Sequence, residues 1–265
     1  MTMDQPLHVE RRGAVAWLTL NRPDDANSID VAMARALLDA TNDLGEHSSV
    51  RALVITGAGR MFCAGGDIKA FTTGGDPKAA IDVITTPLHA AIKRLMAIDK
   101  PVITLVNGPA AGAGLGLAIL GDVVLAARSA RFTSAYTAIG LTPDGGTSWF
   151  LPRLIGLRRA AEMVITNRGV GAEEAERIGL VTRAVDDEML ELEGFQLAQR
   201  LAEMPVTALA RSRTLLAEGL GRSLSDHLDV EARTIAQSAC APEGQTGIAA
   251  FLERRDAKSR GPGQT

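Results

Sequence analysis

The sequence is poor in aromatic residues and in cysteine. Aromatic side chains make up only 3% of the 265 residues, whereas hydrophobic residues reach 46%. The core must therefore be built from alanine, valine, leucine and isoleucine, which are among the residues most often buried. The two cysteines, Cys63 and Cys240, lie far apart, and we expect both to be free thiols in a reducing compartment.

The sequence also lacks a strong charge bias, a secretory signal and a long apolar run. The formal net charge is −3, which excludes a global attraction to nucleic acid. Residues 1–6 carry no apolar segment of the kind that a secretory signal needs. No uninterrupted apolar run approaches the roughly 18 residues that span a bilayer. The prediction is a soluble, cytoplasmic protein without a nucleic-acid or membrane partner.

Glycine is abundant, and it gathers in one stretch that follows an apolar segment. Residues 102–106 are β-branched and apolar and predict a buried strand, and Gly112, Gly114 and Gly116 follow where a helix begins. The first amides of a helix have no internal partner, so bare backbone there can bind an anion or a developing oxyanion. Close packing of small residues is the alternative. A dinucleotide site is disfavoured because Leu117 replaces the third glycine of that motif, and no Lys-Ser or Lys-Thr pair indicates a phosphate loop.

A second glycine-rich turn, at residues 57–67, follows a short buried strand at 52–56. Because both turns follow strands, they can lie on neighbouring strands and present their backbones to one ligand. We therefore expect the N–H groups of Gly66 and Ala113 to point at a single carbonyl oxygen. Removing one donor of such a pair typically costs about 10²–10³ in rate.

The order of elements predicts an α/β core followed by a helical region. Strand-turn-helix units recur near residues 52, 102 and 122, which favours stacked ββα units. After residue 171 the pattern changes to consecutive amphipathic helices. These helices either pack back on the core or need a partner, such as another subunit. The predicted helices cover residues 186–203, 205–218, 223–238 and 243–255.

Four ordered motifs resemble one known family, the enoyl-CoA hydratase/isomerase (crotonase) superfamily. They are N-R-P at residues 21–23, C-A-G-G-D-I at 63–68, V-N-G-P-A-A-G-A-G at 106–114 and I-G-L-T-P-D-G-G at 139–146. The resemblance runs from about residue 8 to about residue 255.

The resemblance implies a fold, an assembly and a substrate class. The expected fold is a crotonase-type spiral of stacked ββα units over residues 1–195, with a C-terminal helical trimerisation region over residues 196–265. The expected assembly is a homotrimer or a hexamer built as a dimer of trimers. The substrate is an acyl-CoA thioester whose carbonyl lies between the amides of Gly66 and Ala113, and its enolate is stabilised there without a metal or a separate cofactor. The resemblance places the following residues around the substrate: Ala26, Ala64, Asp67, Ile68, Lys69, Gly112, Gly116, Tyr136 and Trp149.

The chain departs from the hydratase pattern of this family at two positions. Hydratases carry one glutamate soon after the second glycine-rich turn and another after the following strand. The matching positions here are Gly116 and Tyr136, and neither can move a proton as a carboxylate does. Addition of water by two glutamates is therefore disfavoured.

Asp144 is the acidic residue that remains at a position active in the family. One interpretation is that it caps a helix beginning near Gly145. The other is a general base, which burial among apolar groups would hold partly protonated near working pH. The pattern of residues 143–153 is most similar to the branch typified by the ring-epoxide and Δ3,Δ2-enoyl-CoA isomerases of phenylacetate degradation, where an aspartate in this segment is the acid/base. The favoured reaction is thus a double-bond shift with Asp144 as acid/base.

Three further interpretations stay open. His89 with Asp144 resembles the dyad of 4-chlorobenzoyl-CoA dehalogenase, in which the aspartate attacks the ring and the histidine activates water, but Gly66 and Tyr136 replace two residues of its aromatic cage. His89 is otherwise a partly buried helix residue with a local hydrogen bond.

Tyr136 also has two interpretations. It lines the acyl pocket with its hydroxyl bonded to backbone, or it orients a carboxylate as in decarboxylating members of the family. A CoA-thioester binding module with little turnover is the last alternative.

Overall fold

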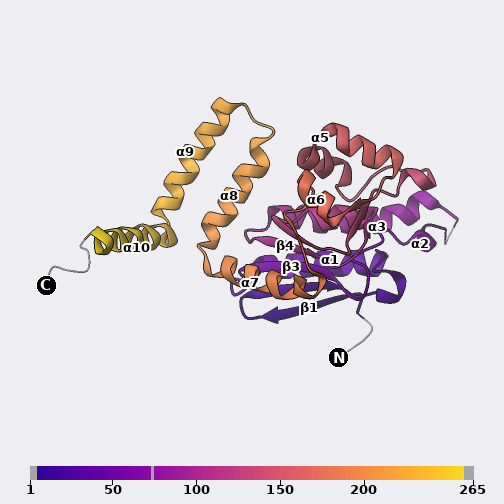
Figure 1. Cartoon of the computed structure of the whole chain (residues 1–265), viewed down its shortest axis with the longest axis horizontal. Helices are drawn as coiled ribbons and strands as arrows, with labels where there is room; N and C mark the ends of the chain where they lie inside the picture. Colours follow the sequence, from indigo (N-terminus) through magenta and orange to yellow (C-terminus); the bar gives the residue numbers. More distant parts are fainter. Residues whose placement is uncertain (1–4, 73–74, 260–265) are drawn as a thin grey trace. The chain divides into compact units, whose positions relative to one another are not determined.

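The computed structural model describes residues 5–72 and 75–259, and it divides into two compact units (Figure 1). The first unit is Met1–Ala202 and the second is Glu203–Thr265. The boundary expected from the sequence, between residues 195 and 196, falls inside helix α7 (Leu190–Glu203).

A six-stranded sheet forms the centre of the first unit. Its order is β1-β2-β3-β4-β6-β9; β1 runs antiparallel to β2, and the other neighbours are parallel. Parallel neighbours need helical crossovers, which is why strands and helices alternate along the chain. The strands are β1 (Leu7–Arg12), β2 (Val15–Leu20), β3 (Ala52–Gly57), β4 (Val102–Val106), β6 (Val123–Ala127) and β9 (Arg183–Val185).

Helices cover this sheet on both faces, so strands such as β2 are buried on both sides. Val15 and Trp17 pack in the cluster that includes residues of α7, whereas Leu18 and Leu20 pack in the cluster of α1 and α3. A nearly continuous apolar strand is typical of a sheet covered on both faces. The helices of this unit are α1 (Val31–Glu46), α2 (Ile68–Thr72), α3 (Pro77–Ala97), α4 (Ala113–Ile119), α5 (Thr147–Thr166), α6 (Ala172–Ile178) and α7, with 3-10 turns η1 (Pro23–Asp25), η2 (Thr137–Ile139) and η3 (Asp187–Met189).

A smaller sheet and two isolated bridges lie across the turns that follow the main strands. The order of this sheet is β5-β7-β8, formed by β5 (Ala110–Ala111), β7 (Arg131–Thr133) and β8 (Val170–Gly171). Single bridges join Ile29 to Gly66 and Cys63 to Ala110. Each ββα unit thus adds one strand to the main sheet and one short segment to the smaller sheet or to a bridge beside it. These short segments hold the two glycine-rich turns next to each other.

The second unit consists of α8 (Val206–Gly219), α9 (Leu224–Cys240) and α10 (Pro242–Ser259). The four leucines and one isoleucine that follow are largely exposed on α8, α9 and the turn between them: Leu216, Leu220, Leu224, Leu228 and Ile235. The α/β class and the C-terminal helices expected from the sequence are both confirmed. In the described part of the chain, no helix combines the length and the apolar character needed to cross a membrane.

Candidate active site

The two glycine-rich turns are in direct backbone contact. Gly65 has a φ of +100°, and a β-carbon placed on it would lie 2.9 Å from the carbonyl oxygen of Ala111 and 3.3 Å from the amide nitrogen of Ala113. A side chain at position 65 would therefore be strained by its backbone and blocked by its neighbours. Glycine at this position allows the turn before Gly66 to reach the start of α4.

The amides around these turns are used for folding, but those of Gly66 and Ala113 are not. The amide of Asp67 donates to Ile29 at 3.0 Å, and the amide of Ala111 donates to Cys63 at 2.9 Å. Within the described residues, the amides of Gly66 and Ala113 donate to no backbone or side-chain acceptor. Ala113 is also the first residue of α4, where the helix dipole favours negative charge. The site thus presents two free N–H groups on touching turns.

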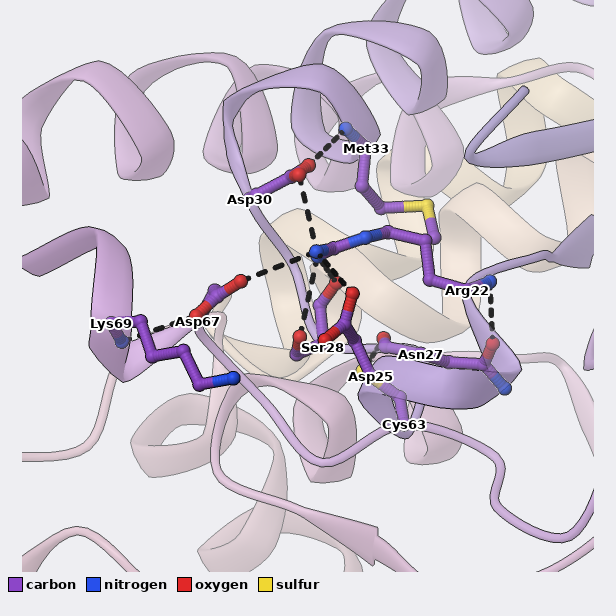
Figure 2. A network of polar contacts seen from close by, with 9 residues as sticks. All are labelled: Arg22, Asp25, Asn27, Ser28, Asp30, Met33, Cys63, Asp67 and Lys69. Atoms are coloured by element: carbon purple, nitrogen blue, oxygen red, sulfur yellow. Dashed lines mark hydrogen bonds and ion pairs between the residues drawn. The ribbon is translucent and has the colours of Figure 1, made fainter. Parts of the chain in front are cut away.

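An ion network centred on Arg22 includes Asp67, the residue that follows Gly66 in the chain (Figure 2). The guanidinium of Arg22 lies 2.8 Å from Asp25, 3.3 Å from Asp30 and 3.3 Å from Asp67. The other carboxylate oxygen of Asp67 accepts the amide of Lys69 at 3.1 Å. Asp67 therefore fixes the chain just after Gly66. Its expected role beside the substrate stays a prediction, as does that of Lys69.

The loop before α1 has its own internal support. Ala26 and Asn27 both have φ values near +55° (55° and 54°), which is uncommon for residues other than glycine. The buried side chain of Asn27 donates to the carbonyls of Ala58 and Met61, both at 2.8 Å. The carbonyl of Ala26 accepts the amide of Ala64 at 3.0 Å, which joins this loop to the first glycine-rich turn.

Asp144 lies on a third turn, which packs against the start of α4. Gly145 and Gly146 have φ values of +58° and +82°, and a β-carbon on Gly145 would lie 3.2 Å from the α-carbon of Ala113. The capping role considered for Asp144 is wrong. Helix α5 begins at Thr147 with Gly146 as its N-cap, without a side-chain cap hydrogen bond. Only the backbone carbonyl of Asp144 accepts from Thr147, at 3.0 Å.

The carboxylate of Asp144 is bound by the single tyrosine of the chain. The hydroxyl of Tyr136 donates to Oδ1 of Asp144 at 2.6 Å, and it lies 3.2 Å from the Asp144 carbonyl. Burial and the negative charge of Asp144 raise the pKa of Tyr136 well above its usual range. The hydroxyl therefore stays protonated and serves as a donor. The expected bond from Tyr136 to backbone is accompanied by this shorter bond to a side chain.

The expectation that Asp144 is buried among apolar groups is wrong. Its side chain is 31% exposed, and a polar hydroxyl and an imidazole are its neighbours. The reason is that Asp144 sits in a turn between η2 and α5 rather than inside a packed element. In this structure the group is an accessible carboxylate at the edge of the site.

His89 reaches the same turn from α3. Its Nε2 lies 3.8 Å from Oδ2 of Asp144 and accepts the amide of Gly145 at 3.3 Å. In this arrangement the lone pair of Nε2 is directed at the backbone of the turn. The hydrogen bond expected for His89 was local, but the one found joins it to the distant Gly145 and holds the turn that carries Asp144.

Gly116 has no room for a side chain. A β-carbon there would lie 2.1 Å from the carbonyl oxygen of Gly145 and 3.2 Å from Oγ1 of Thr147. The Asp144 turn therefore fills the space into which a glutamate at position 116 would project. The tight fit agrees with the sequence argument against a two-glutamate water addition.

The remaining predicted residues lie around these turns with different environments. Ile68 is 54% exposed at the start of α2. Trp149 is 43% exposed, packs edge-on against Phe150 and carries the Arg153 guanidinium 4.0 Å above its ring. A β-carbon on Gly112 would lie 3.9 Å from Cζ of Tyr136, so the tyrosine ring borders the second turn. Cys63 is fully buried, and burial raises its pKa to about 12, which removes it as a nucleophile.

Sequence reasoning placed Arg22 in a motif but assigned it no role, and it missed Asn27 and the bond between Tyr136 and Asp144. Arg22 and Asn27 stand in a loop whose composition predicts only irregular structure. The sequence does carry a signal for Arg22. Three aspartates follow it closely, at positions 24, 25 and 30, and a fourth stands at position 67. No local pattern indicates that Tyr136 points at Asp144.

With this geometry established, similarity to known proteins decides the family. A family model described as enoyl-CoA hydratase/isomerase matches residues 10–261. The chain belongs to the enoyl-CoA hydratase/isomerase family. Members act on acyl-CoA substrates, so the free amides of Gly66 and Ala113 belong to an acyl-CoA enzyme.

Relatives of this enoyl-CoA hydratase/isomerase family member carry several reaction names. A 1,2-epoxyphenylacetyl-CoA isomerase of Escherichia coli K12 is 37% identical over 259 residues, covering 96% of this chain and 97% of the relative. A 4-chlorobenzoyl coenzyme A dehalogenase of an Arthrobacter species is 30% identical over 253 residues, covering 95% and 92%. A solved enoyl-CoA hydratase from Polaromonas sp. JS666 superposes with a TM-score of 0.89 at 32% identity, covering 94% and 97%.

Proposed function

We propose that this enzyme shifts the double bond of an enoyl-CoA thioester, with Asp144 as the acid/base. The observation that carries the proposal is the placement of one accessible carboxylate on a turn that touches Ala113, whose amide is free. The thioester oxygen would accept the amides of Gly66 and Ala113. The reacting carbons would then lie near Asp144.

The reaction needs one base and one anion site, and atoms balance without water. Asp144 removes a proton from C2 of a 3-enoyl thioester, and the C–H electrons delocalise into a dienolate. The negative charge rests on the thioester oxygen between the two amides. Asp144 then returns the proton to C4, so that the C3–C4 double bond is lost and a C2–C3 double bond forms. The crowding at Gly116 supports this reaction over hydration.

The substrate would be surrounded by the residues that the family resemblance indicates. Ala64, Ile68 and Gly112 stand on the two turns that carry the amides. Tyr136 and Trp149 stand on the segments before and after Asp144 and would border the acyl group. Ala26 and Lys69 would border the CoA moiety.

The test is kinetic and uses both double-bond isomers. Purified enzyme is given a 3-enoyl-CoA and, separately, a 2-enoyl-CoA, and products are identified by mass and chromatography. Asp144→Asn should reduce isomerisation by about 10²–10⁴-fold, the usual contribution of a positioned acid/base. Asp39→Asn, which removes an exposed carboxylate of α1, should leave the rate unchanged. Fast hydration of the 2-enoyl ester that Asp144→Asn does not diminish would refute the proposal.

A second candidate is a hydrolytic or dehalogenating reaction that uses His89 and Asp144. Nε2 of His89 lies 3.8 Å from Oδ2 of Asp144. This proximity and the similarity to a dehalogenase are the reasons to test the second candidate. Trapping an acyl or aryl ester on Asp144 and finding solvent ¹⁸O in the product would support it. The bond from the Gly145 amide to His89 argues against it, because the lone pair needed to activate water is already engaged.

We also propose that the second unit joins copies of this chain into a homotrimer or a dimer of trimers. The support is the row of exposed leucine and isoleucine side chains on α8, α9 and their connecting turn. Exposed apolar surface on consecutive helices is typical of a surface that another protein covers.

A further inference from the structure

The two oxygens of the Asp144 carboxylate have different environments. Oδ1 accepts the hydroxyl of Tyr136 at 2.6 Å. The same hydroxyl lies 3.2 Å from the Asp144 carbonyl, but a hydroxyl has a single proton. The shorter bond to a charged acceptor is the stronger of the two. Tyr136 therefore binds Oδ1 specifically.

Oδ2 is the oxygen that stays available. In the portion of the chain that the structure describes, Oδ2 accepts no hydrogen bond, and His89 Nε2 faces it at 3.8 Å. That nitrogen accepts the Gly145 amide at 3.3 Å. His89 and Tyr136 are thus the titratable groups that face the carboxylate, one on each side. Neither occupies Oδ2.

Tyr136 is well placed to hold this arrangement during turnover. The residue is 8% exposed, and its ring borders the turn at Gly112. Burial and the charge of Asp144 keep the hydroxyl protonated, as the raised pKa of Tyr136 indicates. A buried ring has few alternative rotamers, so its hydroxyl is a fixed donor.

We propose that Tyr136 is a positioning residue: it fixes Oδ1 of Asp144, so that Oδ2 alone takes up the proton and returns it. This inference rests on the proposed isomerase function. The proton leaves C2 for Oδ2 and goes from Oδ2 to C4, while the hydroxyl of Tyr136 keeps its own proton. Because one oxygen does both transfers, the proton stays on one face of the dienolate. Deuterium at C2 should therefore appear partly at C4 of the product.

The test compares Tyr136→Phe with the wild-type enzyme on a 3-enoyl-CoA. Losing the donor frees the carboxylate to rotate, and a misplacement of about 1 Å can cost about 10²-fold, so kcat should fall roughly 10- to 100-fold. KM should stay within about twofold, because the thioester is bound by other groups. This split between kcat and KM is the readout that a merely structural role of Tyr136 would not give. An enzyme with 3-fluorotyrosine at position 136 keeps the hydroxyl and should retain a rate near that of the wild type.

A double variant separates positioning from general damage. In Asp144→Asn, adding Tyr136→Phe should cost almost nothing further, because residues that act as a unit are not additive. Thermal unfolding and binding of a saturated acyl-CoA report on folding in each variant. Additive losses, or a KM that rises together with the fall in kcat, would overturn the inference and leave Tyr136 a structural residue.

The outcomes also distinguish this inference from the function on which it rests. If Asp144→Asn isomerises at the wild-type rate, the proposed function itself fails. If Asp144→Asn is inactive but Tyr136→Phe keeps the wild-type kcat, only the positioning role fails. Absence of any deuterium at C4 in the wild-type product, under conditions where exchange is slow, would refute transfer by a single oxygen.

Discussion

The fit between Gly116 and the Asp144 turn leads to a prediction that tests the geometry of the whole site. In Gly116→Ala the new β-carbon would meet the Gly145 carbonyl oxygen at 2.1 Å, far inside van der Waals contact. The obstacle is backbone, so no side-chain rotation relieves it. Helix α4 and the Asp144 turn must separate by roughly 1 Å, and such a displacement can cost about 10²-fold in rate.

The effect on stability is a balance of two opposing terms. Alanine is better than glycine inside a helix by about 1 kcal/mol. Overpacking a dense site costs about 1–3 kcal/mol, and a backbone clash belongs at the upper end of that range. The net expectation for Gly116→Ala is a loss of about 1–2 kcal/mol, equivalent to a fall in Tm of about 2–8 °C. Gly247→Ala is the matched control, because a β-carbon on that helical glycine would have nothing within 4 Å, and its Tm should hold or rise.

The assay combines calorimetry with isomerase and hydratase kinetics. Isomerisation by Gly116→Ala should fall about 10²-fold while that by Gly247→Ala is unchanged. Gly116→Glu, which restores the residue that hydratases of the family carry, should gain no hydration of a 2-enoyl-CoA. A Gly116→Glu protein that melts like the wild type and hydrates the substrate would refute the argument that the turn occupies this space.

Two further predictions concern the loop network and the second unit. Arg22→Met leaves the half-buried Asp67 without its ion pair and should lower the free energy of unfolding by about 1–3 kcal/mol in denaturant titrations; an unchanged midpoint would show that the network does not hold the turn. Leu228→Glu places a charge in the exposed apolar row and should convert a trimer or hexamer into smaller species in analytical ultracentrifugation with unchanged helical content, whereas an unchanged mass would remove Leu228 from the interface.

Local patterns along the chain predicted the elements of the fold well. The apolar run at 102–106 and the glycines after it are β4, β5 and α4, and the C-terminal helices begin and end within a few residues of their predicted limits. Such features depend on neighbours in sequence. The burial of β2 on both faces is different, because one of its covering helices is α7, which lies far along the chain.

The details of the site depend on contacts between distant segments, which a single sequence does not reveal. The glycine at 116 is visible in the sequence, but the carbonyl that excludes a side chain there comes from Gly145. The bond from Tyr136 to Asp144 spans a 3-10 turn whose geometry sets the direction of both side chains. Likewise, the partial exposure of Asp144 follows from the turn that carries it. The sequence indicates which segments meet here, and packing decides what each residue touches.

The missing glutamate at position 116 and the position of Asp144 are two aspects of one arrangement. The turn that presents Asp144 can press against α4 only because position 116 has no side chain, and the same contact brings Gly145 next to Ala113. In the proposed reaction, the amides that would stabilise the enolate are backbone groups and stay in place whichever side chain surrounds them. The reaction is therefore determined by which carboxylate can reach the enolate, and by whether that carboxylate can hold a water molecule. The lack of space for a carboxylate at position 116 is therefore the structural support for the proposed transfer of a proton between two carbons over the addition of water.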